Sequence, residues 1–246
     1  MIVAQEQVDL ATELSPMRVH LHRPQQDGNY PGILLYSEIY QQTAPIARAA
    51  MRLAGHGYLV AVPEIFHQHE PLGAVLNYDP EGTDRGNRYK YATQLSTYDR
   101  DARAVLDHLR DHPRSNGRLG AIGWCLGGHL AFRAAFQPDV RATACFYATD
   151  LHGDSLGEGK QSDSLTRLRE ITGTVMMMFG RKDPHVPDEG RTAIRAALTA
   201  AAIDFTFHEV DAAHAFMRDE GPRYDPSLSS IGWALALDLF ERVLKR

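Results

Sequence analysis

The sequence predicts an α/β fold in which a mostly parallel central sheet is flanked by helices on both faces. Short apolar runs of strand length alternate along the chain with longer segments whose apolar residues recur at helical spacing. Polar residues that could carry chemistry directly follow several of these runs, where the crevice of a parallel sheet lies. With 246 residues, 43% of them apolar, the chain can fill one large core. We therefore expect a single domain over residues 1–246.

The first half of the chain is expected to form three strands and two helices. Alternating apolar and polar residues predict an exposed, antiparallel edge strand, and two short apolar runs predict buried strands. Threonine and proline mark the start of the first helix and Gly-His-Gly marks its end, whereas the second helix has an apolar face. In order, these are strand 17–23, strand 32–37, helix 43–55, strand 58–63 and helix 98–110.

The second half is expected to contain four buried strands and three helices. The strands are short apolar runs, and the helices have apolar residues at helical spacing. In order, these are strand 118–124, helix 126–137, strand 142–147, strand 175–180, helix 189–201, strand 205–210 and helix 228–244. The three consecutive methionines of strand 175–180 are expected in the core. The glycine-rich residues 150–163 are expected to form a mobile surface loop near the functional site.

The most specific motif is a strand–turn–helix segment centred on Cys125. Its sequence, G-W-C-L-G-G, has glycines two residues before and two residues after the thiol. These glycines leave room for the strained turn called a nucleophile elbow, which is typical of α/β-hydrolases. The N-terminus of the following helix favours thiolate over thiol. Taken alone, the motif leaves open that Cys125 is an ordinary buried cysteine.

A base and an orienting acid follow Cys125 in the order that α/β-hydrolases use. Asp183 follows strand 175–180, and His214 lies in the loop after strand 205–210. Asp183 would hold the His214 ring in one tautomer, and His214 would take the proton from Cys125 and return it to the leaving group. Singly, each could be an ordinary turn residue. Their order at three strand ends predicts a Cys-His-Asp triad.

At this point the chain resembles the dienelactone hydrolase family, also called carboxymethylenebutenolidases. The resemblance covers nearly the whole chain and includes the elbow at Cys125, the Asp-Pro at Asp183, the H-x-F-x-R loop that begins at His214, and an acidic residue after the first buried strand. It implies an α/β-hydrolase fold and a hydrolase that opens lactones or cleaves activated esters. The elbow and triad need no metal, so we expect no cofactor.

The resemblance also implies roles for three residues near the thiol. Glu38 stands at the position of the family's glutamate, which hydrogen-bonds the resting thiol and, when substrate binds, swings to help deprotonate it. The backbone N–H groups of Ile39 and Leu126 would form the oxyanion hole. Without the resemblance, Glu38 would be interpreted as a solvated loop carboxylate.

Substrate contacts are expected from two arginines and two aromatic residues. In the family, two arginines clamp the substrate carboxylate, which a guanidinium can hold bidentately. Arg218 matches one of them directly. The other falls in an insertion before helix 98–110, where Arg85 is our choice and Arg88 the alternative. Trp124 and Tyr147 lie at strand ends and are candidates for touching substrate.

Composition narrows the remaining function classes. The formal net charge of −5, without a basic run, argues against a nucleic-acid or anionic-membrane partner. The N-terminus lacks signal-peptide features, and no apolar stretch approaches the roughly 20 residues that span a bilayer. Of the two cysteines, Cys145 lies in an apolar strand and is expected to be inert. A disulfide with Cys125 would destroy the nucleophile, so we expect a reducing, cytoplasmic location. We expect a monomer or a small homo-oligomer.

Other interpretations remain open on the sequence alone. A broad-specificity thiol carboxylesterase could share the fold and the triad. A cysteine glutaminase would usually carry an acid two residues after the histidine, where this chain has Phe216. A non-catalytic binding protein could retain a hydrolase shell. His67 and His69 could share a metal, although two loop histidines are weak evidence and solvated side chains are favoured.

Overall fold

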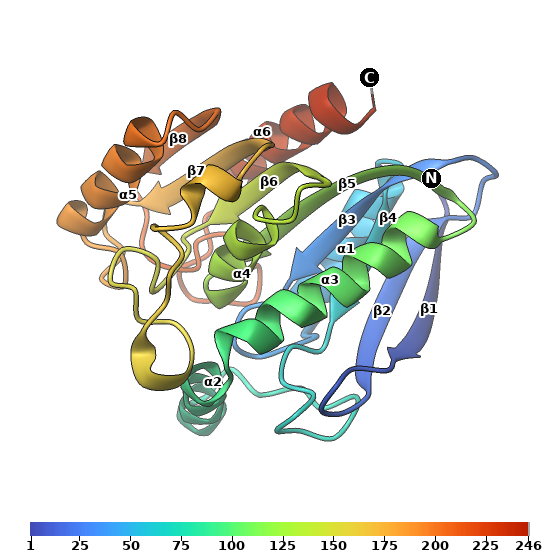
Figure 1. The fold of residues 1–246 in the computed structure, drawn as a ribbon, viewed down its shortest axis with the longest axis horizontal. Helices are drawn as coiled ribbons and strands as arrows, with labels where there is room; N and C mark the ends of the chain where they lie inside the picture. The colour runs from blue at the N-terminus through green and yellow to red at the C-terminus, as the bar shows by residue number, and fades with distance from the viewer. Residues whose placement is uncertain (246) are drawn as a thin grey trace.

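The computed structural model describes residues 1–245, which form an eight-stranded sheet with helices on both faces (Figure 1). The strands are β1 Val3–Leu10, β2 Met17–Pro24, β3 Tyr30–Tyr36, β4 Leu59–Pro63, β5 Ser115–Trp124, β6 Val140–Phe146, β7 Thr174–Gly180 and β8 Phe205–Val210. The α-helices are α1 Ala44–Gly55, α2 Pro80–Ala92, α3 Leu95–Asp111, α4 Leu126–Ala134, α5 Asp188–Ala200 and α6 Pro226–Leu244. This architecture confirms the predicted mostly parallel α/β fold.

The sheet order is β1-β2-β4-β3-β5-β6-β7-β8. β2 pairs antiparallel with β1 and β4, and the pairs from β4 through β8 are parallel. In the sheet, β4 lies on one side of β3 and β5 lies on the other. The direction in which successive strands are added therefore reverses between β3 and β5. Ligand crevices of open α/β sheets lie at such a point, outside the carboxyl ends of the strands. Glu38 follows β3 and Cys125 follows β5, which brings both to this crevice.

Alternating side chains of the buried strands supply two separate cores. In β3, Ile33 belongs to the core that includes residues of α1 and α6, whereas Leu34 belongs to the core that includes residues of α3, α4 and α5. Figure 1 shows α3 and α4 crossing the near face of the sheet. The three methionines of β7 are 2% exposed or less, which confirms their expected core position. Both faces of the sheet are therefore covered, and its carboxyl edge is left for the site.

Two elements differ from the predictions. β2 is not the sheet edge, because β1 pairs along its outer side from Val3 opposite Pro24 to Leu10 opposite Met17. Most of β1 is polar and only partly buried, so its apolar signal is weak. α2 lies within the segment interpreted as an insertion. Its start is fixed by Pro80 and by the Asp79 side chain, which accepts a hydrogen bond from the backbone N–H of Gly82.

Candidate active site

Cys125 occupies a strained turn between β5 and α4. Its backbone φ of 59° and ψ of −122° lie outside the regions that most side chains adopt. A Cβ at Gly123 would lie 2.0 Å from the carbonyl oxygen of Gly127, and one at Gly127 would lie 2.3 Å from that of Ser37. Only glycine fits at either position. The turn is further held by the Cys125 N–H, which donates to the Phe146 carbonyl at 3.1 Å.

His214 and Asp183 form a buried pair at the neighbouring strand ends. The His214 Nδ1 lies 2.7 Å from Asp183 Oδ2, and Asp183 Oδ1 accepts the backbone N–H of His185 at 2.8 Å. Both carboxylate oxygens are thus engaged, and Asp183 is only 2% exposed. The rings of Tyr147 and His185 pack edge-on against the imidazole, at centroid distances of 5.0 and 4.6 Å. The imidazole is therefore fixed in orientation.

The electrostatic surroundings favour a charged imidazole. Burial lowers the pKa of His214, but the negative charge of a Cys125 thiolate and the Asp183 carboxylate outweigh burial and raise this pKa to about 10. Once negative charge develops on the Cys125 sulfur, His214 is therefore a stronger base than a free imidazole.

Glu38 is a buried carboxylate beside Arg218. It is 4% exposed, and its Oε2 lies 3.4 Å from the Arg218 Nη1. Burial raises the pKa of Glu38, against the opposing effects of Arg218 and His214. Among residues 1–245, no hydrogen bond joins Glu38 to Cys125. The carboxylate thus faces the arginine, not the thiol with which the family resemblance pairs it.

The two amides expected in the oxyanion hole are available. Leu126 is the first residue of α4, so its N–H has no acceptor within the helix. Neither this N–H nor that of Ile39 donates a hydrogen bond within the part of the chain that the structure describes. Ile39 is supported from behind by α2, because a Cβ on Gly86 would lie 2.5 Å from the Ile39 carbonyl oxygen. A glycine at this position lets the helix pack against the Ile39 backbone.

A cavity of about 540 Å³ brings five of the ten predicted site residues together. Its lining includes Cys125, His214, Glu38, Ile39 and Arg218. Its volume lies within the range of small-molecule sites. Asp183 hydrogen-bonds His214 and does not itself line the cavity.

Arg85 and Arg88 do not line this cavity, so the structure does not bring either candidate arginine to Cys125. The Arg85 guanidinium hydrogen-bonds Glu70, and that of Arg88 lies over the ring of Tyr89. The physical reason is that this segment is a helix. Residues 83, 87 and 90, spaced by four and three positions, line the cavity, and positions 85 and 88 lie on other sides of the helix.

Trp124 and Tyr147 line a second, smaller cavity instead of the one that contains Cys125. Tyr147 is 1% exposed and touches the His214 ring, so its contact is with the base. Trp124 stacks on Phe146 at a centroid distance of 5.7 Å. Neither aromatic ring therefore faces the space in front of the thiol.

Three charged residues of the cavity that contains Cys125 were not identified from the sequence. Lys90 Nζ lies 2.9 Å from Asp150 Oδ2, with side chains 8% and 10% exposed. Burial lowers the pKa of Lys90, but Asp150 outweighs it and the net shift is upward. Arg223 also lines the cavity and has no carboxylate partner among residues 1–245. If α2 had been predicted as a helix, the spacing of residues 83, 87 and 90 would have placed Lys90 on the cavity side. Arg223 lies in a loop, where no periodic pattern predicts which way a side chain points.

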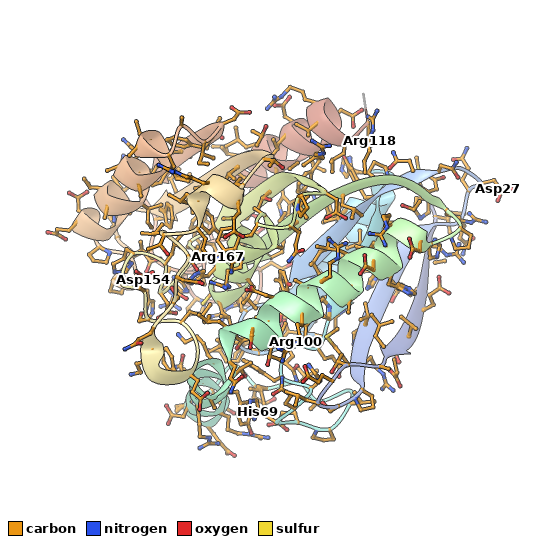
Figure 2. The ribbon with its side chains drawn as sticks, in the orientation of Figure 1. Asp27, His69, Arg100, Arg118, Asp154 and Arg167 are labelled. Atoms are coloured by element: carbon orange, nitrogen blue, oxygen red, sulfur yellow. The ribbon has the colours of Figure 1, made fainter. Side chains whose placement is uncertain are left out.

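The remaining histidine and cysteine candidates do not line the cavity that contains Cys125 and are held by other side chains or buried in the core. His67 is buried and not solvated as expected, and its Nε2 lies 2.9 Å from Asp101 Oδ2. His69 lies beside α2, with its Nε2 3.0 Å from the Thr93 hydroxyl (Figure 2). No group of three or more His, Cys, Asp or Glu side chains suited to a metal ion occurs in residues 1–245. Cys145 is fully buried, as expected, and burial raises the pKa of its thiol. Across the same range, no helix combines the length and the apolar character needed to cross a membrane.

Comparison with known proteins identifies relatives along almost the entire chain. Residues 17–244 match the model of the dienelactone hydrolase family. A Saccharomyces cerevisiae protein named "Putative carboxymethylenebutenolidase" is 40% identical over 93% of this chain and 88% of its own. The carboxymethylenebutenolidase of Pseudomonas putida is 25% identical over 85% of this chain and 84% of its own.

Solved structures agree on the fold. The crystal structure of a dienelactone hydrolase-like promiscuous phosphotriesterase from metagenomic libraries superposes with a TM-score of 0.79. It is 21% identical, and the alignment covers 98% of each chain. Together, the family match and the 40% identical relative show that this chain is a carboxymethylenebutenolidase-like hydrolase with the α/β-hydrolase fold, and that it belongs to the dienelactone hydrolase family.

Proposed function

We propose that this hydrolase opens lactones or cleaves activated esters through a Cys125-His214-Asp183 triad. The observation that carries the proposal is the elbow thiol, which shares a cavity with an imidazole hydrogen-bonded to a buried carboxylate. His214 takes the thiol proton as the Cys125 sulfur attacks the acyl carbon, and the N–H groups of Ile39 and Leu126 stabilise the oxyanion. Imidazolium then protonates the leaving oxygen, and a thioester remains. Water activated by His214 releases the acid and regenerates the thiol.

Leaving-group chemistry favours lactones and activated esters over amides. A thiolate is itself a good leaving group, so the tetrahedral intermediate returns to substrate unless the departing group leaves more easily. An enol or phenol oxygen does so, whereas an amide nitrogen does not. Enol lactones are therefore the class of substrate that suits this nucleophile best.

Glu38 is proposed to assist thiol activation. Its raised pKa, caused by burial, makes the carboxyl a stronger base than an exposed glutamate, and Arg218 holds it near the cavity. We expect Glu38→Gln to slow alkylation of Cys125 by iodoacetamide at pH 7, measured by mass spectrometry over time. Glu70→Gln is the matched control, because Glu70 pairs with Arg85 outside the cavity. If Glu38→Gln and the native protein react at equal rates, Glu38 has no part in activation.

The positively charged lining is proposed to select substrates that bear a carboxylate. Arg218 pairs with Glu38, and Lys90 pairs with Asp150. Among the cations that line the cavity, Arg223 has no carboxylate partner in residues 1–245 and can bind an anion. Arg223→Gln is expected to lower kcat/KM for a lactone acid by about tenfold and to leave its methyl ester nearly unchanged. Arg85→Gln, the control, should change neither. Equal losses on acid and ester would contradict a carboxylate contact at Arg223.

A substrate panel tests the proposed function as a whole. Purified protein is assayed with enol lactones and nitrophenyl esters, each with and without a carboxylate. The account predicts the highest kcat/KM for carboxylate-bearing lactones. Equal activity on uncharged nitrophenyl esters would favour the broad-specificity thiol carboxylesterase instead. Absence of hydrolysis across the whole panel would contradict both.

A further inference from the structure

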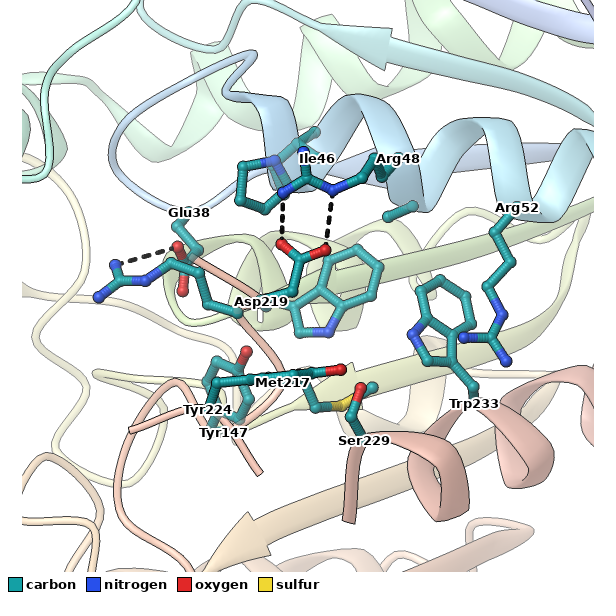
Figure 3. A pocket seen from close by; sticks show the side chains of 14 residues that line it. Glu38, Ile46, Arg48, Arg52, Tyr147, Met217, Asp219, Tyr224, Ser229 and Trp233 are labelled. Atoms are coloured by element: carbon teal, nitrogen blue, oxygen red, sulfur yellow. Dashed lines mark hydrogen bonds and ion pairs between the residues drawn. The ribbon is translucent and has the colours of Figure 1, made fainter. Parts of the chain in front are cut away.

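A second cavity, of about 120 Å³, lies beside the catalytic one and shares Glu38, Arg218 and no other lining residue with it. Figure 3 shows it between α1 and the start of α6, with Glu38 at one end and Arg52 at the other. Cys125 does not line it. A ligand held there would lie against the Glu38 carboxyl without occupying the space in front of the thiol.

Part of the wall of this cavity is formed by aromatic rings and a polarizable methionine side chain. The rings of Trp124 and Trp233 lie 5.6 Å apart between centroids, and their residues are 4% and 6% exposed. Met217 adds a polarizable thioether, which makes favourable contacts with aromatic rings. A dry apolar cavity of about 150 Å³ is known to hold one benzene molecule. The space is therefore close to that of a single six-membered ring.

Of the two arginines that α1 contributes to the cavity, one is paired with carboxylates and the other, within the described part of the chain, is not. Arg48 is held by Asp219 at 2.6 Å and by Glu220 at 2.8 Å. Arg52, one helical turn further along α1, is exposed and lies over the Trp233 ring at 4.7 Å. No carboxylate pairs with Arg52 in residues 1–245. This guanidinium is free to accept an anion.

The opposite end of the cavity disfavours an anion. Arg218 is already paired with Glu38, whose carboxylate would repel a second negative charge. A ligand with one ring and one anionic group would therefore place the ring toward Trp124 and the charge toward Arg52.

We propose that this cavity is a second small-molecule site, which binds a single aromatic ring bearing a carboxylate. The ring packs against the surface formed by the two tryptophans and Met217, and the carboxylate pairs with Arg52. Cys125 does not contribute to this binding site, and binding is measured without any catalytic assay.

Intrinsic fluorescence reports on the site directly, because the only two tryptophans of the chain both line it. Titration with benzoate is expected to give a saturable change in emission. Arg52→Gln should weaken benzoate binding about tenfold and leave uncharged benzamide unaffected. Arg141→Gln, at an exposed site remote from the cavity, should behave as the native protein.

Two further measurements separate this site from the catalytic cavity. Ala49→Phe fills the space and should abolish binding of benzoate, whereas Ala47→Phe on the same helix should not. Benzoate should still bind after Cys125 has been alkylated with iodoacetamide. The proposal is overturned by a titration without saturation, by native affinity in Arg52→Gln or Ala49→Phe, or by loss of binding on alkylation of Cys125.

Discussion

Replacing Cys125 by alanine is expected to lower ester hydrolysis by about 10⁶-fold, the scale of loss when a triad nucleophile is removed. The covalent step would then have no nucleophile, although the cavity and the His214–Asp183 pair would remain. Cys125→Ser is also expected to be severely impaired, because a serine hydroxyl gives up its proton far less readily than a thiol. Both are checked as kcat/KM on a nitrophenyl ester.

Cys145 provides the matched control for this prediction. It is fully buried, and burial raises the pKa of its thiol, so Cys145→Ala should retain catalytic activity. Iodoacetamide should correspondingly inactivate the native protein and Cys145→Ala at the same rate. Full hydrolytic activity in Cys125→Ala would refute the proposed mechanism.

Asp183→Asn is expected to lower kcat on the order of 10⁴-fold. An asparagine amide in place of the carboxylate can favour the tautomer of His214 that cannot accept the thiol proton. It also removes one of the two charges that raise the pKa of His214 to about 10, so this pKa should fall. The measurements are kcat on a nitrophenyl ester and the pH profile of Cys125 alkylation.

Asp211→Asn is the control for the triad acid. Asp211 lies in the same loop as the histidine but is exposed and pairs with Lys182. Its replacement should leave kcat within a factor of about two, as expected of a surface ion pair. A similar kcat in Asp183→Asn and Asp211→Asn would show that Asp183 does not orient the base.

The sequence was sufficient to predict the fold and the geometry around the thiol because both depend on local chemistry. Buried parallel strands require continuous apolar runs, and the turn at Cys125 requires glycines where a Cβ would meet backbone atoms at 2.0 to 2.3 Å. These constraints are visible in the order of residues. Asp183 and His214 could be located for the same reason, since each directly follows a recognisable strand.

The cavity walls were less predictable because they come from elements with weak apolar patterns. α2 is polar on most of its surface and contains Gly82 and Gly86, so its helical periodicity is poor. Interpreting this segment as an insertion led to Arg85, whereas the helix turns Lys90 toward the cavity. The pairing of Glu38 with Arg218 joins residues 180 positions apart. Such a contact follows from tertiary packing and not from local pattern.

The most direct test of the central claim is mass spectrometry of the acyl intermediate. The native protein is mixed with a nitrophenyl ester and quenched in acid during the first turnover, and its peptides are then analysed. The account predicts the acyl group as a thioester on the peptide that contains Cys125, and its absence from Cys125→Ala. An acyl group on another residue, or rapid turnover with none on Cys125, would contradict a cysteine nucleophile.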